Sequence, residues 1–297
     1  TLDTIPGPLL DRMEVLEIAG YTENEKFHIG KQYLIPKQIK KNGLKKSQLV
    51  INDKALKTII SEYTREAGVR GLERQIGKIC KAAKLVVEEK QEKVRVSGKN
   101  IEEFLGKKKF RPDMANAENE IGIVRGLAWT QVGGDTLEIE VNIMPGEGNL
   151  ILTGQLGDVM QESARIALSY VRSIVKKEAS YFKEHDIHLH VPEGAVPKDG
   201  PSAGVTMSTA LYSAIEGIPV DAKVAMTGEV TLRGKVLPIG GLKEKLLAAK
   251  SAGIKKVLVP QENKPDVEEL EEEITDGIQI VFVTKVKQVL KESLVER

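Results

Sequence analysis

The sequence predicts two parts of different fold class, a small all-α bundle followed by an α/β (α+β) domain. Up to Pro112 there are 24 Lys and Arg against 15 Asp and Glu, whereas from Asp113 onward the counts are 20 and 28. Apolar residues recur at helical spacing before this point and alternate with polar residues after it. The stretch from Lys107 to Glu120 is charged, contains a proline and lacks periodicity. We therefore expect domains at residues 1–112 and 121–297, joined by a linker at 113–120.

Length and composition restrict the class of protein. The chain has 297 residues, of which 41% are hydrophobic and 29% charged, as in ordinary globular proteins. No run approaches the ~20 apolar residues of a membrane helix, and no signal peptide is recognisable, so we expect a cytoplasmic location and no membrane partner. The single cysteine, Cys80, excludes an internal disulfide framework and a Cys-based zinc site. Because the first residue is Thr1, we expect a fragment or a processed product.

Helix-start signals and apolar periodicity predict the bundle. We expect helices that begin at Thr22, at Asn52 or Asp53, near Val69 and after Asn100. Acidic residues follow Thr22, as in a capped first turn, and Pro36 is expected to kink or break the helix that begins there. The second helix is expected to end at Gly68. Helices of this number and length are enough to pack around one apolar core.

The second part alternates strands and helices. Expected strands lie at 122–132, 136–143, 149–153, 187–191, 224–226, 235–237, 256–260 and 278–283. Expected helices lie at 159–175, 203–215, 242–252 and 286–294. The segment 136–143 shows the clearest alternation of apolar and polar residues, and 203–215 has the composition of a buried helix. This order of elements is typical of an α/β or α+β domain.

One Pro- and Gly-rich loop, Pro192–Gly204, leads from a strand into a helix whose first turn is expected to hold Ser202. A hydroxyl there lies beside unpaired backbone N–H groups at the positive end of the helix. Such donors stabilise an oxyanion that develops on an attacked carbonyl. The alternative is that Ser202 is a simple N-cap, and position alone favours the cap.

A serine nucleophile needs a base, and the chain has only four histidines. His188 and His190 share one face of a predicted strand, where they are a base, two metal ligands or ordinary strand residues. No third ligand is evident from the spacing, so ordinary strand histidines are favoured and no metal site is predicted. The other candidate base is a lysine whose pKa burial depresses.

Lys245 is such a lysine. It follows Leu242 by three residues on a predicted helix whose apolar face also carries Leu246 and Ala249. A lysine that points into an apolar cleft loses its charge and can accept a proton from serine. The alternative is a surface lysine whose charged end reaches solvent, and spacing alone favours it.

Three motifs, Pro197–Gly204, Ala225–Glu229 and Gly240–Lys245, occur in an order that resembles the proteolytic domain of Lon, the ATP-dependent serine protease. The upstream segments Gly126–Thr130 and Gly157–Ser163 match as well. The resemblance covers essentially the whole second part and implies a Ser–Lys protease domain. By this resemblance Ser202 and Lys245 form the catalytic dyad, a Ser–Lys variant of triad chemistry that requires no cofactor or metal.

The resemblance also implies two supporting residues. Thr227 is expected near the dyad, where it would hydrogen-bond the lysine amine, or else it is a turn residue at a strand end. Asp199 is expected to gate or shape the loop before the serine, or else it makes a local turn with Gly200. The implied reaction is peptide hydrolysis through an acyl-enzyme, with backbone N–H groups around Ser202 as the oxyanion hole.

The first part also resembles Lon, through Ile5–Glu14 and Arg65–Arg74, which are similar to the end of its AAA+ ATPase module and its small helical subdomain. Arg12 then matches the arginine finger and Arg70 the sensor-2 arginine, and the alternative for both is a salt-bridged helix arginine. The family uses ATP and Mg²⁺ in the full-length protein. This sequence has no G-x-x-x-x-G-K-[ST] loop, so we expect no ATP hydrolysis by the chain alone.

The resemblance implies partners and a cellular role. Expected substrates are unfolded or damaged proteins, in protein quality control and the stress response, and the expected assembly of the full-length protein is a homohexamer. The net charge of +9 over the first 112 residues makes DNA a second candidate partner, although a solvated charged face is favoured. A third alternative is an inactive structural ring.

Overall fold

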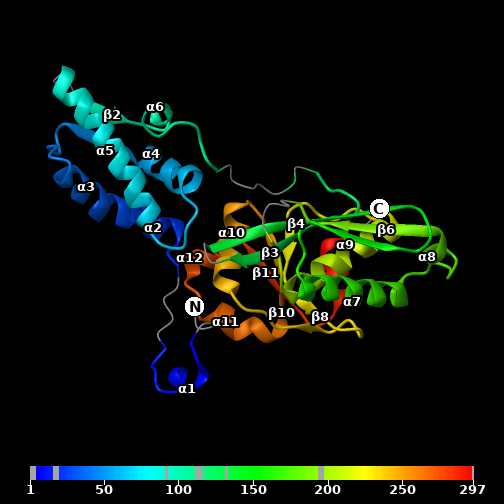
Figure 1. Ribbon diagram of the computed structural model, residues 1–297. Coiled ribbons are helices and arrows are strands. Elements are labelled where there is room, and N and C mark those ends of the chain that lie inside the picture. Colours follow the sequence, from blue (N-terminus) through cyan, green and yellow to red (C-terminus); the bar gives the residue numbers. More distant parts are fainter. Residues whose placement is uncertain are drawn as a thin grey trace. The chain divides into compact units, whose positions relative to one another are not determined.

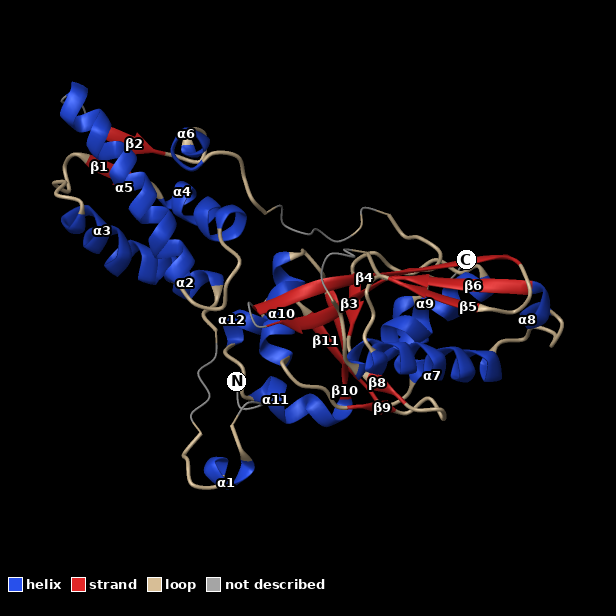
Figure 2. Ribbon diagram, in the orientation of Figure 1, coloured by secondary structure: helices blue, strands red, loops and turns tan. Residues whose placement is uncertain are grey.

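The computed structural model describes residues 5–15, 20–90, 93–110, 116, 118–130, 133–192 and 197–295. The chain divides into two compact units, Thr1–Lys109 and Phe110–Arg297. The first is mainly helical and the second combines helices with a large sheet (Figures 1 and 2). Within the predicted linker, residues 113–115 and 117 lie outside the described residues, as do 131–132 at the end of one predicted strand.

The first unit is the predicted helical bundle. Its helices are α1 (Gly7–Leu10), α2 (Glu23–Ile29), α3 (Ile35–Lys41), α4 (Asp53–Thr58), α5 (Arg70–Lys90) and α6 (Ile101–Leu105). Two π-helical turns, η1 (Gly30–Leu34) and η2 (Ile59–Tyr63), follow α2 and α4. A short parallel pair, β1 (Leu49–Ile51) and β2 (Val94–Val96), completes the unit. The core lies where α4, η2 and α5 bury Leu56, Ile59, Leu72 and Ile76.

The four predicted helix starts are confirmed, and the side-chain caps predicted there are present at two positions and absent at a third. Thr22 and Glu25 form a reciprocal capping box, with Thr22 Oγ1 accepting from Glu25 N at 3.0 Å. Asn52 Oδ1 accepts from Ala55 N at 2.7 Å and caps α4. Asn100 occupies the N-cap position of α6, but its side chain accepts from Ser97 N at 2.7 Å and stabilises the preceding turn instead.

Pro36 does not break its helix. The elements α2, η1 and α3 form one continuous helical run, since the junction residues Gly30 and Leu34 are themselves helical, and the π-helical turn η1 directly precedes the proline. The next helical segment ends at Tyr63 rather than at Gly68, because Thr64 is extended. The Thr64 hydroxyl donates to the Ile60 carbonyl at 2.8 Å, and Tyr63 Oη donates to Gly106 O at 2.8 Å. These two bonds end the segment before its glycine.

The second unit is built on a mixed seven-stranded sheet with the order β11-β10-β7-β3-β4-β6-β5. Its strands are β3 (Ile123–Thr130), β4 (Gly133–Pro145), β5 (Leu150–Thr153), β6 (His185–His190), β7 (Val224–Met226), β10 (Lys256–Pro260) and β11 (Gln279–Val283). The β3–β4 and β4–β6 pairs are antiparallel, and the other pairs are parallel. A separate hairpin joins β8 (Glu229–Val230) to β9 (Val236–Leu237).

Helices pack on both faces of the sheet. They are α7 (Asp158–Ile174), α8 (Tyr181–Glu184), α9 (Gly204–Glu216), α10 (Leu242–Ser251), α11 (Lys264–Glu268), α12 (Glu272–Thr275) and α13 (Val286–Ser293). Met226 and Leu258 belong to the apolar core under α7 and α9, whereas Ala225 and Val257 belong to the core under α10. Neighbouring residues of β7 and β10 thus face opposite helices, as alternation along a strand requires. The prediction of a helical bundle followed by an α/β domain is confirmed.

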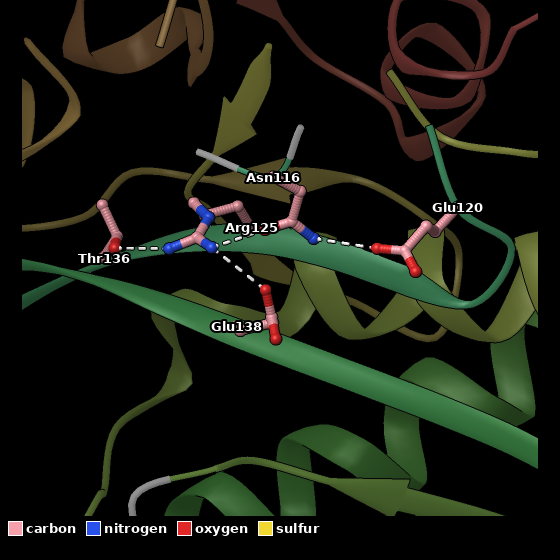
Figure 3. Close-up of polar contacts among 5 residues, drawn as sticks. All are labelled: Asn116, Glu120, Arg125, Thr136 and Glu138. Carbon is pink, nitrogen blue, oxygen red and sulfur yellow. Dashed lines mark hydrogen bonds and ion pairs between the residues drawn. The ribbon is translucent and has the colours of Figure 1, made fainter. Parts of the chain in front are cut away.

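A buried arginine fixes the chain where it enters this sheet (Figure 3). Arg125 on β3 is 7% exposed and forms an ion pair with Glu138 on β4 at 3.0 Å. Its Nη1 donates to Thr136 Oγ1 at 2.9 Å and its Nη2 to Asn116 Oδ1 at 2.6 Å. Asn116 in turn donates to Glu120 at 3.4 Å. The charge is therefore compensated, and residue 116 is held against the sheet.

Candidate active site

Ser202 lies in a 3₁₀ turn, η3 (Pro201–Ala203), that leads directly into α9. The N-cap of α9 is Ala203, so the interpretation of Ser202 as a simple cap is wrong. The Ser202 carbonyl accepts from Gly228 N at 2.8 Å, and Val205 N donates to Gly228 O at 3.1 Å. These bonds attach the turn to the chain segment that follows β7, and they leave the Ser202 residue half-buried.

Lys245 lies in the first half of α10 and is 2% exposed. The predicted apolar face is confirmed, since Leu242, Leu246 and Ala249 are buried beside it. Burial lowers the pKa of the Lys245 amine from 10.5 to about 8, because desolvation disfavours the charged form. The alternative of a surface lysine is wrong, and Lys245 has the chemistry of an amine that gains and loses a proton near neutral pH.

Thr227 connects the two elements. It follows β7 directly, it is fully buried, and its backbone N donates to Leu258 O on β10 at 3.1 Å. Lys245 Nζ donates to Thr227 Oγ1 at 3.2 Å, and the same hydroxyl donates to the Ser202 carbonyl at 3.4 Å. Within the described part of the chain, no hydrogen bond links Ser202 Oγ directly to Lys245 Nζ.

The fold explains why these residues meet. The helices α9 and α10 cover opposite faces of the sheet, and β7 lies in the sheet between them. Ser202 precedes α9, Lys245 lies near the start of α10, and Thr227 stands at the carboxyl end of β7. In sheets with parallel strands this edge is where functional residues gather. The site is therefore positioned by three buried elements rather than by one loop.

Asp199 is bound to the start of α7 rather than to Lys245. Its Oδ1 accepts from Met160 N in the first turn of α7 at 2.9 Å, and from Gly200 N at 2.9 Å. The carboxylate thus supplies the cap that Gly157, the N-cap residue, lacks. A Cβ at position 157 would lie 2.4 Å from Asp199 Cγ, so only glycine admits this contact. The expected local turn with Gly200 is absent: the carboxylate contacts only the adjacent amide, no turn is formed at residues 199–200, and Pro201 has no N–H for a turn two residues on.

Sequence reasoning missed the packing around the lysine helix. Gly241 has a φ of +67°, and a Cβ there would lie 2.8 Å from Cγ of Trp129. Gly134 lies so close to the Glu244 carbonyl that a Cβ would overlap it. Trp129 itself is 56% exposed. The β3–β4 hairpin therefore seats the N-terminus of α10, and the only signal in the sequence was the glycines themselves.

The structure does not bring the histidines to this site. His188 Nε2 and His190 Nδ1 lie 2.8 and 2.7 Å from Thr153 Oγ1 on β5. His185 Nδ1 lies 2.9 Å from Tyr181 O, and its ring stacks on Tyr181. Among the residues that the structure describes, no group of three or more His, Cys, Asp or Glu side chains is close enough to hold a metal ion.

The first unit carries both arginines of the predicted nucleotide site on its surface. Arg12 follows α1, and Arg70 is the first residue of α5; both are exposed. The amides of Gly71 and Leu72 at the start of α5 donate to the Glu66 carboxylate at 2.7 and 2.8 Å. A carboxylate therefore occupies the helix end at which a phosphate would bind.

No helix in the described ranges has the length and apolarity needed to cross a membrane.

Comparison with known families covers both units. Residues 95–296 match the Lon protease (S16) C-terminal proteolytic domain, and residues 40–95 match the Lon protease AAA+ ATPase lid domain. Lon protease of Lachnoclostridium phytofermentans is 55% identical over an aligned length of 338 residues, and the alignment covers 99% of this chain and 42% of the relative. Lon protease 1 of Bacillus subtilis is 55% identical over 298 residues, covering 99% and 38%.

Lon protease of Vibrio parahaemolyticus is 56% identical over 295 residues, which is 98% of this chain and 38% of the relative. The chain thus spans about two fifths of the length of these relatives, between 38% and 42%. The proteolytic-domain match alone covers more than half of the chain and includes Ser202, Thr227 and Lys245. The chain therefore belongs to the Lon protease family of serine peptidases and contains its C-terminal proteolytic domain and its ATPase lid.

Proposed function

We propose that the second unit hydrolyses peptide bonds of unfolded or damaged proteins, with Ser202 as nucleophile and Lys245 as general base. The observation that carries the proposal is the buried Lys245 amine, whose pKa is lowered to about 8 and whose Nζ donates to Thr227 Oγ1. An amine in this state is neutral often enough near neutral pH to accept the serine proton. Thr227 keeps it within reach of the Ser202 turn.

The reaction follows from this arrangement. Ser202 Oγ attacks the scissile carbonyl carbon while its proton passes to the neutral amine of Lys245. The tetrahedral oxyanion is stabilised by backbone N–H groups at the start of α9, where the helix end is electropositive. The Lys245 ammonium then protonates the leaving amine, which leaves Ser202 acylated. Water, deprotonated by Lys245, attacks the ester, releases the acid and restores both residues.

Thr227 and Asp199 are positioning residues in this proposal. The Thr227 hydroxyl orients the lysine amine, since it accepts from Nζ and donates to the Ser202 carbonyl. Asp199 ties the loop before Ser202 to the first turn of α7. We expect the distance between Ser202 Oγ and Lys245 Nζ to shorten when substrate binds, because catalytic hydrogen bonds often tighten only in the substrate complex.

The further roles of the family are proposed for the longer protein. The lid match supports a coupling of peptide hydrolysis to ATP hydrolysis, with Arg12 and Arg70 as nucleotide-linked residues. A hexameric assembly and a cytoplasmic location in protein quality control belong to the same proposal. DNA binding by the exposed lysines of the first unit stays a prediction, and a gel shift over a salt titration tests it.

Cleavage of a fluorescently labelled, unstructured protein by the chain tests the peptidase. Ser202→Ala and Lys245→Ala are each expected to lower kcat by at least about 10³-fold, because nucleophile and base act as a unit. Lys243→Ala on the same helix is the matched control and is expected to retain activity. Full activity of Lys245→Ala would show that another group is the base.

A further inference from the structure

Two histidines stand on the face of β6 that turns away from the helical core. Ile187 and Leu189 are 3% and 0% exposed and belong to the core under α7 and α9. His188 and His190 alternate with them and lie half-buried on the opposite face of the sheet. They are therefore presented side by side by a rigid strand, and the peptidase chemistry uses neither of them.

The two imidazoles converge on one point. His188 Nε2 lies 2.8 Å and His190 Nδ1 lies 2.7 Å from the same oxygen, Thr153 Oγ1 on the neighbouring strand β5. A hydroxyl has one proton, so it donates to one ring nitrogen and accepts an N–H from the other. The two ring centroids are 6.4 Å apart and the rings are nearly perpendicular, at 73°. Both ring edges are thus aimed at the position that Thr153 Oγ1 occupies.

We propose that His188 and His190 bind a first-row transition-metal ion of the class that imidazole ligates, with Zn²⁺ as the representative. Zinc–imidazole bonds are about 2.0–2.1 Å long, so the rings need to close by less than about 1 Å on their common point. Thr153 is exposed, and its side chain can turn aside or remain as a weak ligand. The ring that donates to Thr153 changes tautomer, which frees its lone pair without a change in net charge.

The surroundings favour a cation. In the β4–β6 register Glu140 stands directly opposite His190, and Asn142 stands opposite His188. Side chains of directly opposed residues lie on the same face of a sheet, so the negatively charged Glu140 shares the face of the imidazole pair without being close enough to act as a ligand. Among the described residues the pair has no third protein ligand in place, so water completes the coordination sphere. We therefore expect weaker binding than in a closed structural zinc site, together with low reorganisation cost on a rigid strand.

Titration calorimetry of the chain with Zn²⁺, in a buffer that does not coordinate metal, tests this site. One Zn²⁺ is expected per chain, and His188→Gln and His190→Gln are each expected to weaken binding at least 10-fold. Glutamine can keep a hydrogen bond to Thr153, and equal melting temperatures would verify that the variants fold. His185→Gln is the matched control, because His185 lies on the same strand but stacks on Tyr181. Millimolar Mg²⁺ is not expected to compete, since it prefers oxygen ligands.

NMR of the imidazole protons gives a second readout that is independent of peptidase activity. The chain has four histidines, so their resonances are few and can be assigned with single variants. Addition of Co²⁺ is expected to broaden the signals of His188 and His190 and to spare those of His28 and His185. Unchanged Zn²⁺ affinity in the variant with both glutamines, or broadening of His185 in place of the pair, would overturn the proposal.

Discussion

At the scale of single residues, the burial of Lys245 controls the protonation of its amine. The side chain is 2% exposed, and its pKa falls to about 8 because the charged form loses hydration. Sequence spacing alone favours a solvent-exposed lysine at this position. The difference arises because the β3–β4 hairpin and the sheet close over the helix, and that enclosure depends on residues far away in the chain, such as Gly134.

The first prediction concerns the pH dependence of hydrolysis. In the proposed mechanism only neutral Lys245 accepts the serine proton, so kcat/KM is expected to rise with pH and to reach half of its plateau near pH 8. At pH 7 about one molecule in ten holds the neutral amine. Initial rates on a short fluorogenic peptide between pH 6 and 9.5 measure the profile. A flat profile would contradict the role of Lys245 as base.

The second prediction concerns stability. The folded-state pKa of Lys245 is about 8 and the unfolded value is near 10.5, so the unfolded chain binds more protons between these values. Wild-type stability therefore rises with pH through this window. Lys245→Met is expected to raise the free energy of unfolding by an amount on the order of 3 kcal/mol below pH 8, where the wild-type chain must bury a charged amine. Above pH 10.5 the amine is neutral in both the folded and the unfolded chain, so the substitution is expected to change the free energy of unfolding little. Urea unfolding at pH 7 and pH 10.5 tests the difference, while the variant should be inactive.

At the scale of elements, the loop before Ser202 is held by a helix cap. Asp199 Oδ1 accepts from Met160 N, so Asp199→Ala is expected to lower the free energy of unfolding of the second unit by about 1 kcal/mol and to lower kcat. Asp199→Asn keeps an acceptor oxygen and should retain most of the stability. Asp158→Ala, at the exposed first position of α7, is the matched control. Equal losses for Asp199→Ala and Asp158→Ala would mean that the helix dipole, and not the cap, is responsible.

A second helix cap gives a matched pair in the first unit. Asn52 accepts from Ala55 N at the start of α4, whereas Asn100 holds the preceding Ser97 turn. Asn52→Ala is expected to cost about 1 kcal/mol, because the N-terminal amide of α4 loses its partner. The thiol of Cys80 provides the measurement: it is fully buried and its pKa is raised to about 11, so a disulfide reagent reacts only through opening of the unit. If Asn52→Ala left the rate of the Cys80 thiol reaction unchanged, the assignment of Asn52 as a stabilising cap of α4 would be contradicted.

Elements differ in how far local sequence predicts them. The strands at 224–226 and 256–260 have the predicted bounds, and the long helices differ by one or two residues, since burial patterns are strong there. The helix expected to run to Gly68 ends at Tyr63, because hydrogen bonds to Ile60 and Gly106 outweigh the local propensity. The Asn100 side chain likewise could bind the amides at the start of α6 or the amide of Ser97, and the sequence does not distinguish the two; in the structure it binds Ser97 N.

At the scale of the whole molecule, the last prediction is that the two units unfold separately. Cys80 is the chain's single cysteine and lies in the first unit, whereas the proposed peptidase site lies in the second. Urea is expected to expose Cys80 and to abolish activity at different concentrations. Asn52→Ala should shift only the thiol transition, and Arg125→Ala, which leaves Glu138 without its ion-pair partner, only the activity transition. Coincident transitions that move together in both variants would show one cooperative unit instead.

The sequence by itself determined the two fold classes, most helices and strands, and the motifs that resemble the Lon family, because periodicity and capping are local properties. It also singled out Ser202, Thr227 and Lys245 as candidates. Tertiary structure decided that Ser202 precedes the helix rather than capping it, that the Lys245 amine is buried, and that His188 and His190 converge on Thr153. Desolvation and close approach depend on segments distant in the chain, which only the folded sheet and its helices bring together.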